Sequence, residues 1–537
     1  MTRTIITETP AGTSNSFALA AGDELIVAPG VILADDTLNA IGGAFGGNIV
    51  HILGSVLSGG NGVSLSDFAD DDANSRLMIA PGGSVVGEGS GIVTSRDRFE
   101  IQIDGAVQGE VGVRHTFGDF YFLVVGATGS VAGFDEGILV SSNDARLTNY
   151  GQVSSLSGQN GIQMSGERTA LVNHGVVSSP VDAVRHTGNT DANVVNHGQL
   201  SGGVTLAGGA DVFSNFGMLQ GDADMENGDD VLTNAGLIDG DVALGQGADT
   251  FDGRGGRVAG DIDGGEGDDV YILDRASDSR RIVDADGVDE VQTEGFFRLR
   301  DGIENLTQLD GGDWKGIGNA LANSLRGNGG DNKLLGLIGN DTLIGGLGDD
   351  MLKGGLGTDL ADYRDSFDRI VVSLLDGVAA GSEIGEDRLK GIEQVLGGSA
   401  NDRIIGSNTA NSLGGNFGND RLDGEGGADV LNGGGGADRL FGGRGADTMT
   451  GGFDADRFVI EATANGADAI TDFTDGEDRI DLRSLNLVRR QFEDLLDGAL
   501  SQSGGDAVLS LARLGADGSI TLQGVDGATL DRSDFLV

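Results

Sequence analysis

The stretch Gly345-Gly346-Leu347-Gly348-Asp349-Asp350-Met351-Leu352-Lys353 is one copy of a nine-residue phrase that recurs between Gly318 and Val459. In its fullest form the phrase has glycine at the first, second and fourth places, an acid at the sixth and an aliphatic residue at the eighth. Two frames restart every nine residues, one from Gly318 to Gly354 and one from Gly397 to Gly451. A disordered glycine-rich linker is the alternative, but a linker has no reason to place an aliphatic residue at every ninth position.

Each residue type in the phrase has a physical task. Glycine tolerates positive φ and lets the backbone turn tightly, so carbonyl groups can point at a common centre. The buried aliphatic marks a short strand, and two phrases make one coil of 18 residues. A hard cation such as Ca²⁺ takes six to eight oxygen ligands, which carbonyls and one carboxylate from each of two neighbouring turns can supply. The spacing therefore predicts calcium sites at turns that stack on the same edge.

The predicted ligands are the sixth-position aspartates and the fourth-position glycines of these turns. They are Asp341, Asp350, Asp359, Asp402, Asp420, Asp429, Asp438, Asp447 and Asp456, with Gly339, Gly348, Gly357, Gly418, Gly427, Gly436 and Gly445. Several phrases depart from the pattern, and we expect their sites to be weak or without calcium. The departures are Leu321, Ala400, Thr409 and Asp454 at the fourth place, and Asn323, Asn332 and Asn411 at the sixth.

These phrases resemble the RTX, or hemolysin-type, calcium-binding repeats. The resemblance implies a parallel β-roll with calcium between its coils. It also implies export by a type I secretion system, with an ABC exporter as a partner.

The composition agrees with folding that depends on cations. Acids outnumber bases by 84 to 34, which gives a net charge of -50, and 98 of the 537 residues are glycine. Self-repulsion and the entropy of ordering glycine both oppose compaction, so we expect the chain to stay largely unfolded until calcium binds. The same charge makes nucleic acid an improbable partner. Absence of cysteine excludes disulfides and thiolate metal sites.

The two ends of the chain carry further expectations. Met1–Ala20 lacks the basic and apolar regions of a cleaved signal, and no run of 18 apolar residues predicts a transmembrane helix. The last residues, Asp534-Phe535-Leu536-Val537, resemble type I secretion signals, with an ordinary edge strand as the alternative. Before them we expect an amphipathic helix over about Ser484–Leu500 and two strands at Ala507–Leu511 and Ser519–Gln523.

The first half of the chain carries a different repeat, apolar-x-Asn-x-Gly-x-apolar. Its asparagines are 24, 23, 19 and 19 residues apart, at Asn149, Asn173, Asn196, Asn215 and Asn234. Periods near 20 with short strands between Asn and Gly turns are typical of a parallel β-helix. We therefore predict an all-β protein: a right-handed parallel β-helix, then the β-roll, then a small β-rich cap.

An acidic column runs through the later part of this predicted helix. Asp211, Asp230, Asp249 and Asp269 follow one another at steps of 19, 19 and 20 residues, and Asp222, Asp241 and Asp261 keep the same step. Stacked carboxylates repel one another strongly unless a cation lies between them. Our hypothesis is a calcium ladder along this edge, and the alternative is that the acids only solvate turns.

The predicted organisation has six parts. They are the β-helix at 1–273, a connecting segment at 274–317, β-roll blocks at 318–362 and 397–460, an interleaved strand segment at 363–396, and a cap with secretion signal at 461–537. A strand is expected in the interleaved segment at Ile370–Leu374.

No catalytic motif stands out. None of the five histidines begins an H-E-x-x-H pair, and neither a G-x-S-x-G elbow nor a P-loop is present. His174 and His197 recur at equivalent coil positions, which favours a stacked surface ladder. The enzymatic alternative is a polysaccharide lyase or epimerase that acts in a β-helix groove, with Arg114, His115, Asp182, Arg185 and His186 as its polar groups.

The favoured function is therefore a secreted, calcium-binding structural or adhesive protein. It would work at a bacterial surface or in the extracellular matrix, through a cell-surface polysaccharide or through self-assembly.

Overall fold

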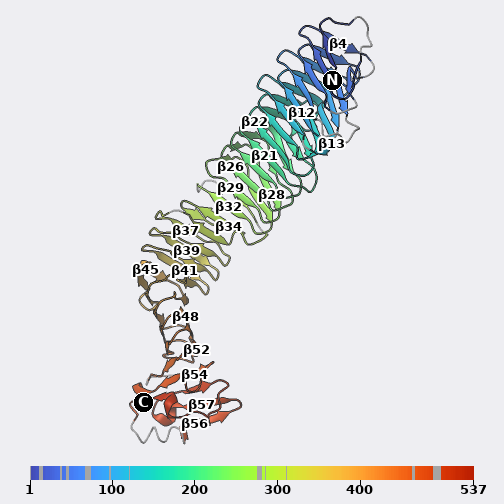
Figure 1. The fold of residues 1–537 in the computed structure, drawn as a ribbon. Coiled ribbons are helices and arrows are strands. Elements are labelled where there is room, and N and C mark those ends of the chain that lie inside the picture. The colour runs from blue at the N-terminus through green and yellow to red at the C-terminus, as the bar shows by residue number, and fades with distance from the viewer. Residues whose placement is uncertain are drawn as a thin grey trace. The chain divides into compact units, whose positions relative to one another are not determined.

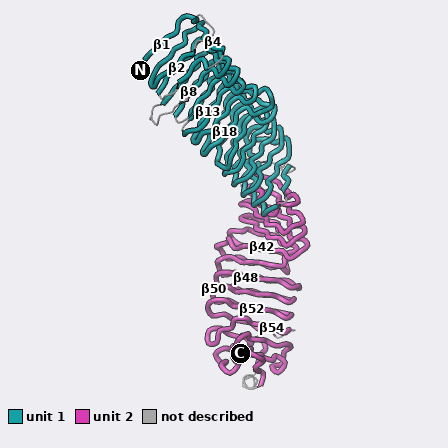
Figure 2. The backbone as a smooth tube through the Cα atoms, turned by 90° about the vertical axis from the view of Figure 1, so that its right-hand side faces the viewer, with its two compact units in different colours: residues 1–289 teal, residues 290–537 magenta. Residues whose placement is uncertain are grey.

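The computed structural model describes residues 2–10, 16–36, 39–43, 47–66, 74–95, 98–119, 121–274, 281–284, 286–309, 311–461, 466–487 and 498–537. The chain forms two compact units, Met1–Asp289 and Glu290–Val537 (Figure 2). Both consist mainly of short parallel strands stacked in chain order (Figure 1), which confirms the predicted all-β parallel solenoid. The division at Asp289 falls inside the predicted connecting segment, and the finer six-part division stays a prediction.

One sheet of the first unit takes one strand from each coil. Its strands are β1 (Arg3–Ile6), β3 (Glu24–Val27), β6 (Ile49–Ile52), β9 (Ser75–Ile79), β12 (Phe99–Ile103), β14 (Phe122–Val125), β16 (Arg146–Asn149), β19 (Thr169–Asn173), β21 (Ala192–Asn196), β23 (Val212–Asn215), β26 (Val231–Asn234), β29 (Thr250–Asp252) and β32 (Val270–Leu273). Arg146 pairs with Ala170, a step of 24 residues, whereas Val212 pairs with Val231, a step of 19. The coils therefore shorten where the acidic column begins.

Alternate residues of these strands point into the core, because side chains of a strand alternate between its two faces. One inward column is buried along seven coils and comprises Leu147, Leu171, Val194, Phe213, Leu232, Phe251 and Tyr271. Full burial of such a side chain contributes about 1.5–3 kcal/mol. A second sheet covers the other side of the coils and includes the long strands β13 (Ala106–Asp119), β15 (Ser130–Asn143), β20 (Val176–His186) and β22 (Gln199–Leu206).

The repeated asparagine of the first unit forms a buried amide ladder. Each Nδ2 donates to Oδ1 of the asparagine one coil later, at 2.8–2.9 Å, through Asn149, Asn173, Asn196, Asn215 and Asn234. Beside it, the exposed rings of Tyr150, His174, His197 and Phe216 stack with centroids 4.8–5.0 Å apart. The predicted surface ladder of His174 and His197 is thus present.

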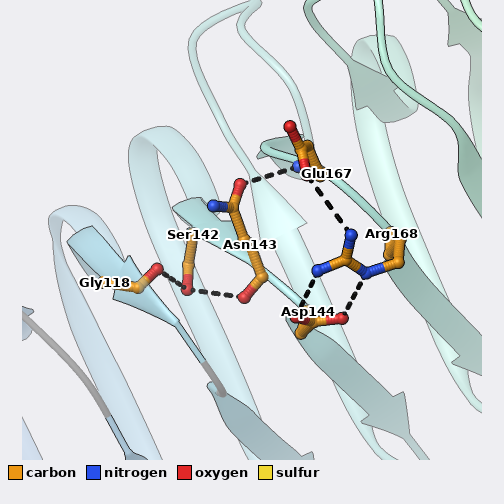
Figure 3. A network of polar contacts seen from close by, with 6 residues as sticks. All are labelled: Gly118, Ser142, Asn143, Asp144, Glu167 and Arg168. Carbon is orange, nitrogen blue, oxygen red and sulfur yellow. Dashed lines mark hydrogen bonds and ion pairs between the residues drawn. The ribbon is translucent and has the colours of Figure 1, made fainter.

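Polar contacts also join successive turns at the edge of the first unit (Figure 3). The Ser142 hydroxyl donates to the Gly118 carbonyl at 2.7 Å, and Asn143 accepts the Glu167 N–H at 2.9 Å. Arg168 then holds the Asp144 carboxylate through two hydrogen bonds of 2.8 Å. These neighbouring coils are therefore tied to one another outside the sheets as well as within them.

The second unit has two sheets built on an 18-residue coil. One contains β34 (Glu290–Thr293), β36 (Asn305–Gln308), β38 (Ser324–Arg326), β40 (Thr342–Ile344), β42 (Leu360–Asp362), β46 (Gln394–Leu396), β48 (Ser412–Phe417), β50 (Val430–Gly435), β52 (Thr448–Phe453) and β54 (Ala467–Ile470). The other contains β35 (Phe297–Arg298), β37 (Lys315–Ile317), β39 (Lys333–Ile338), β41 (Met351–Leu356), β47 (Arg403–Ser407), β49 (Arg421–Glu425), β51 (Arg439–Phe441), β53 (Arg457–Val459) and β55 (Arg479–Asp481). The eighth residue of each phrase is buried and stacks on its counterpart one coil away, as with Leu422 and Leu440.

An antiparallel insertion interrupts the second sheet without ending it. β45 (Gly385–Lys390) lies parallel to β41, runs antiparallel to β44 (Val378–Gly381), and leads through β43 (Ile370–Ser373) to β47. The strand expected at Ile370–Leu374 is confirmed. The antiparallel pairing of β44 with β43 and β45 was not predicted.

The C-terminal region closes the second unit with short strands. β56 (Leu500–Ser503), β57 (Asp506–Ser510) and β58 (Ser519–Leu522) form an antiparallel meander, and β58 pairs with β54. The final strand β59 (Phe535–Leu536) pairs with β55. Most of the helix expected over Ser484–Leu500 lies outside the described residues, and Arg483–Leu485 forms a 3₁₀ turn. Among the described residues, no helix has the length and apolar character needed to span a bilayer.

Candidate calcium-binding ladders

The sixth-position aspartates of the second unit form two hydrogen-bonded ladders. In each rung, the backbone N–H of one residue donates to Oδ1 of the aspartate that lies one coil later. The distances are 2.7–2.9 Å for the pairs Asn323 to Asp341, Asn332 to Asp350, Asp341 to Asp359, Asp402 to Asp420, Asn411 to Asp429, Asp420 to Asp438, Asp429 to Asp447 and Asp438 to Asp456. The structure therefore brings together the predicted ligands of neighbouring coils.

The second carboxylate oxygen separates two kinds of turn. In eight turns Oδ2 is buried and has no hydrogen-bond partner; they belong to Asp341, Asp350, Asp359, Asp420, Asp429, Asp438, Asp447 and Asp456. In all eight the fourth-position residue has a left-handed backbone, at Gly339, Gly348, Gly357, Gly418, Gly427, Gly436, Gly445 and Asp454. Asp454 thus adopts the conformation that glycine has elsewhere.

In the other four turns, the sixth-position side chain has a hydrogen-bond partner within its own turn. Here the sixth-position oxygen accepts the N–H of the residue four positions earlier, at 2.7–2.8 Å: Asn319 to Asn323, Asn328 to Asn332, Gly398 to Asp402 and Ser407 to Asn411. Their fourth residues, Leu321, Gly330, Ala400 and Thr409, are not left-handed. We call these the capped turns. Asp402 is the one predicted aspartate ligand among them.

Burial raises the pKa of the eight aspartates whose Oδ2 has no hydrogen-bond partner, and we call their turns uncapped. Desolvation raises the pKa of Asp350, Asp420, Asp429 and Asp456 to about 7, and that of Asp341 and Asp438 to about 6. The neighbouring carboxylate in the ladder adds to the rise, as Asp438 does for Asp420. A buried anion without a partner is costly, so the second oxygen needs either a proton or a cation. The residues present therefore fit calcium at these turns, which would supply that positive charge.

Two sets of residues in these ladders escaped the sequence analysis. The first is the first-position glycine, since a Cβ at Gly442 would lie 2.6 Å from Oδ2 of Asp447, and the same holds at each uncapped turn. The invariant glycine at that place was the available signal. The second set continues the ladders outside the nonapeptides, where its carboxylates accept backbone N–H groups of the last regular turns. The acceptors are Asp387 for Asp350, Glu393 for Asp359, Asp468 for Asp447 and Asp478 for Asp456.

The acidic column of the first unit repeats the same turn. The N–H of Asp211 donates to Asp230, Asp230 to Asp249, and Asp249 to Asp269, at 2.6–2.8 Å. Oδ2 of Asp211, Asp230, Asp249 and Asp269 is buried without a hydrogen-bond partner, and a left-handed glycine stands two residues before each, at Gly209, Gly228, Gly247 and Gly267. Burial raises the pKa of Asp230 and Asp269 to about 7.

The companion column in the first unit is of another kind. Asp222, Asp241 and Asp261 are exposed, and their hydrogen bonds run in the opposite direction: the N–H of Asp241 donates to Asp222. These side chains solvate the turns, as the alternative interpretation expects.

The polar groups of the enzymatic alternative do not form an exposed groove. His115 and His186 are fully buried; His115 lies 2.9 Å from the Thr94 hydroxyl and stacks on Tyr121. Asp182 forms an ion pair with Arg185 at 3.2 Å. Desolvation lowers the pKa of His186 from its usual value.

Comparison with known proteins agrees with the geometry of the second unit. Residues 317–361, 396–431 and 423–458 match the family described as the RTX calcium-binding nonapeptide repeat (4 copies). These segments are RTX calcium-binding repeats, and they are carried by a parallel β-solenoid. The second unit of the chain therefore contains calcium-binding RTX repeats. No curated protein matches the chain.

Two solved structures are similar to parts of the chain. One is the AlgE6R3 subunit from the Azotobacter vinelandii mannuronan C5-epimerase, with 24% identity, a TM-score of 0.15, and coverage of 26% of this chain and 80% of that one. The other is the extracellular lipase LipA from Serratia marcescens, with 17% identity, a TM-score of 0.13, and coverage of 46% of this chain and 45% of that one. The chain therefore spans less than half the length of the lipase.

Proposed function

We propose that this chain is a secreted RTX protein that folds when calcium binds and serves a structural or adhesive role at the bacterial surface or in the extracellular matrix. The observation that carries the proposal is the set of eight buried carboxylate oxygens without hydrogen-bond partners in the second unit. Without a cation, each of these carboxylates must either take up a proton or stay an uncompensated buried charge. Calcium binding free energy thus becomes folding free energy.

Secretion follows from the affinity expected of such sites. Extracellular calcium modules bind with dissociation constants of roughly 10⁻⁴–10⁻³ M, so the chain would remain largely unfolded in a calcium-poor cytoplasm. The proposed exporter signal at the C-terminus supports the same order of events. In the folded unit Asp534 is fully buried and Phe535 is part of β59, so an exporter would have to read this tail before folding.

A column of arginines supports a contact with an anionic polysaccharide. Arg403, Arg421, Arg439, Arg457 and Arg479 are register partners on successive strands of the second unit. None is buried, although the whole chain has a net charge of -50. Burial lowers the pKa of Arg457, and repulsion from nearby arginines such as Arg439 lowers it further. A polymer of uronates would bring one carboxylate after another to these guanidinium groups and relieve that repulsion.

The folding part of the proposal is tested by far-ultraviolet circular dichroism during a calcium titration. We expect β-structure to rise with calcium and to fall again with a chelator. A β-content that stays constant throughout would contradict coupled folding.

The adhesive part is tested by binding of the calcium-loaded protein to a uronate polymer and to a neutral polysaccharide. We expect binding to the uronate alone, with a several-fold loss in the double variant Arg403→Gln/Arg439→Gln. Arg513→Gln changes the charge of an exposed arginine in the C-terminal meander region and serves as the matched control. Equal binding by the unmodified chain, the double variant and the control variant would contradict a role of the arginine column in polysaccharide binding.

A further inference from the structure

The C-terminal end of the first unit holds a cluster of three carboxylates. Asp269, Asp284 and Asp289 each place one oxygen within 4.8 Å of the other two. Their exposed fractions are 1%, 6% and 0%. Asp269 and Asp289 are successive rungs of the acidic column, since the N–H of Asp269 donates to Oδ1 of Asp289 at 2.9 Å. Asp284 lies outside that column and comes from the strand region of β33 (Ile282–Val283).

A second observation shows that oxygen atoms of Asp269 and Asp284 in this cluster point toward the backbone of Gly264. Oδ1 of Asp269 accepts the N–H of Asp249, whereas Oδ2 is buried and has no hydrogen-bond partner. A Cβ added to Gly264 would collide with this Oδ2 and with the hydroxyl of Tyr271, and would lie 2.5 Å from Oδ2 of Asp284. These three oxygen atoms therefore converge on one point beside the bare backbone of Gly264 in β31 (Ile262–Glu266).

We propose that Asp269, Asp284 and Asp289 bind one calcium ion, at a site separate from the RTX repeats. The donor set consists of oxygens only, which suits a hard divalent cation and does not suit zinc or copper. Three carboxylates within one small buried volume repel one another, and a dication offsets most of that charge. The Tyr271 hydroxyl, which donates to Asp284 Oδ2 at 2.6 Å, holds that carboxylate in place.

This site differs from an ordinary rung of either ladder. A rung contributes one unpartnered oxygen per turn, whereas here Asp284 adds a further carboxylate from outside the column. β33 pairs with β31 through Ile282 and Ile262, so the ion would fasten the last described strand of the first unit to the coil before it. The inference does not depend on the RTX sites, because all its residues lie in the first unit.

The test counts calcium ions bound to the full-length protein by native mass spectrometry. We expect Asp284→Asn, a change that preserves shape, to bind one ion fewer than the unmodified chain. Asp263→Asn changes an exposed carboxylate on the neighbouring strand β31 and should bind the same number as the unmodified chain. Asp429→Asn reports on the RTX ladder, so failure of the proposed function is distinguishable from failure of this site.

A second measurement uses terbium, a calcium substitute whose emission is excited through a nearby tyrosine. Tyr271→Phe keeps all three carboxylates, so it should keep the ion count and lose part of the tyrosine-sensitised emission. An ion count unchanged by Asp284→Asn would overturn the site, and so would terbium emission unchanged by Tyr271→Phe. If Asp284→Asn binds the same number of ions and is more stable without calcium, the cluster holds a shared proton and the proposal is wrong.

Discussion

The backbone N–H of Asp420 donates a 2.7 Å hydrogen bond to Oδ1 of Asp438, one 18-residue coil further along the chain. The carboxylate of Asp438 therefore completes the turn of the previous coil with one oxygen, while its other oxygen is buried without a hydrogen-bond partner. One side chain thus couples the stacking of coils to the demand for a positive charge.

Asp420→Asn and Asp402→Asn form a matched pair. Oδ2 of Asp420 has no partner, whereas Oδ2 of Asp402 already accepts the Gly398 N–H at 2.8 Å. We expect Asp420→Asn to weaken the calcium affinity of its site at least ~10-fold, about 1.4 kcal/mol, and Asp402→Asn to change it much less. Isothermal calorimetry and the calcium midpoint of circular dichroism measure the difference. Equal midpoints for the two variants would contradict the distinction between capped and uncapped turns.

Gly442→Ala tests the space reserved for the carboxylate. Its φ is not left-handed, so alanine fits the backbone, but the added Cβ would lie 2.6 Å from Oδ2 of Asp447. We expect a higher calcium midpoint, because the carboxylate must move. Gly435→Ala is the control, since its Cβ meets nothing closer than 3.5 Å, a side-chain atom of Phe417. A shift of the same size in both variants would indicate a general loss of glycine flexibility instead.

The pH dependence should have opposite signs with and without calcium. Burial raises the folded-state pKa of Asp420 and Asp429 from 3.8 to about 7, so the penalty on folding without calcium is small near pH 4, grows as pH rises and is complete above about 7. Calcium-free protein should therefore gain β-structure between pH 8 and pH 5. Calcium must displace the protons, so its apparent affinity should fall over the same interval. Circular dichroism at fixed free calcium checks both trends, and a calcium-free β-content that falls on acidification would refute the first.

Asn196→Leu tests the amide ladder of the first unit. Asn196 accepts from Asn173 and donates to Asn215, both at 2.8 Å, and it is fully buried. Leucine removes these two ladder bonds and the side-chain bonds to the Met218 carbonyl and the Gly198 N–H, and each buried polar atom left unsatisfied costs about 1–3 kcal/mol. We expect a clearly lower denaturation midpoint at saturating calcium. His197→Ala, which removes an exposed stacked ring next to it, should cost less than about 1 kcal/mol, and an equal loss would argue against the ladder.

Much of the fold was predictable because its signals are local and periodic. Glycine at Gly436 and the aliphatic Leu440 stand at fixed distances from Asp438, so turn, ligand and core position could be read from one phrase. The asparagine repeat marked the coils of the first unit in the same way, since Asn196 must meet Asn215 to satisfy its buried amide.

The site residues that were not predicted lie where the spacing of the repeat is interrupted, although they still contact the regular ladder residues. Asp350 takes its acceptor from Asp387, 37 residues later, because the hairpin of β43 and β44 is inserted in the chain between them. Asp284 reaches Asp269 by a similar departure from the step of the column. A hydrogen bond depends on position in space and not on a constant number of residues, so no repeat pattern could have identified these partners. The hydrogen bond that caps Asp402 also depends on the backbone angles of its turn, and Ala400 in place of glycine is only an indirect sign of those angles.

The direction of the rungs has a consequence for how the second unit becomes ordered. Each turn takes its acceptor from the coil that follows it, and the last turns, at Asp447 and Asp456, take theirs from Asp468 and Asp478 of the terminal segment. A turn thus finds its template only once the chain beyond it is in place. We therefore expect the stack to grow from the C-terminus back toward the N-terminus, against the order in which a ribosome makes the chain.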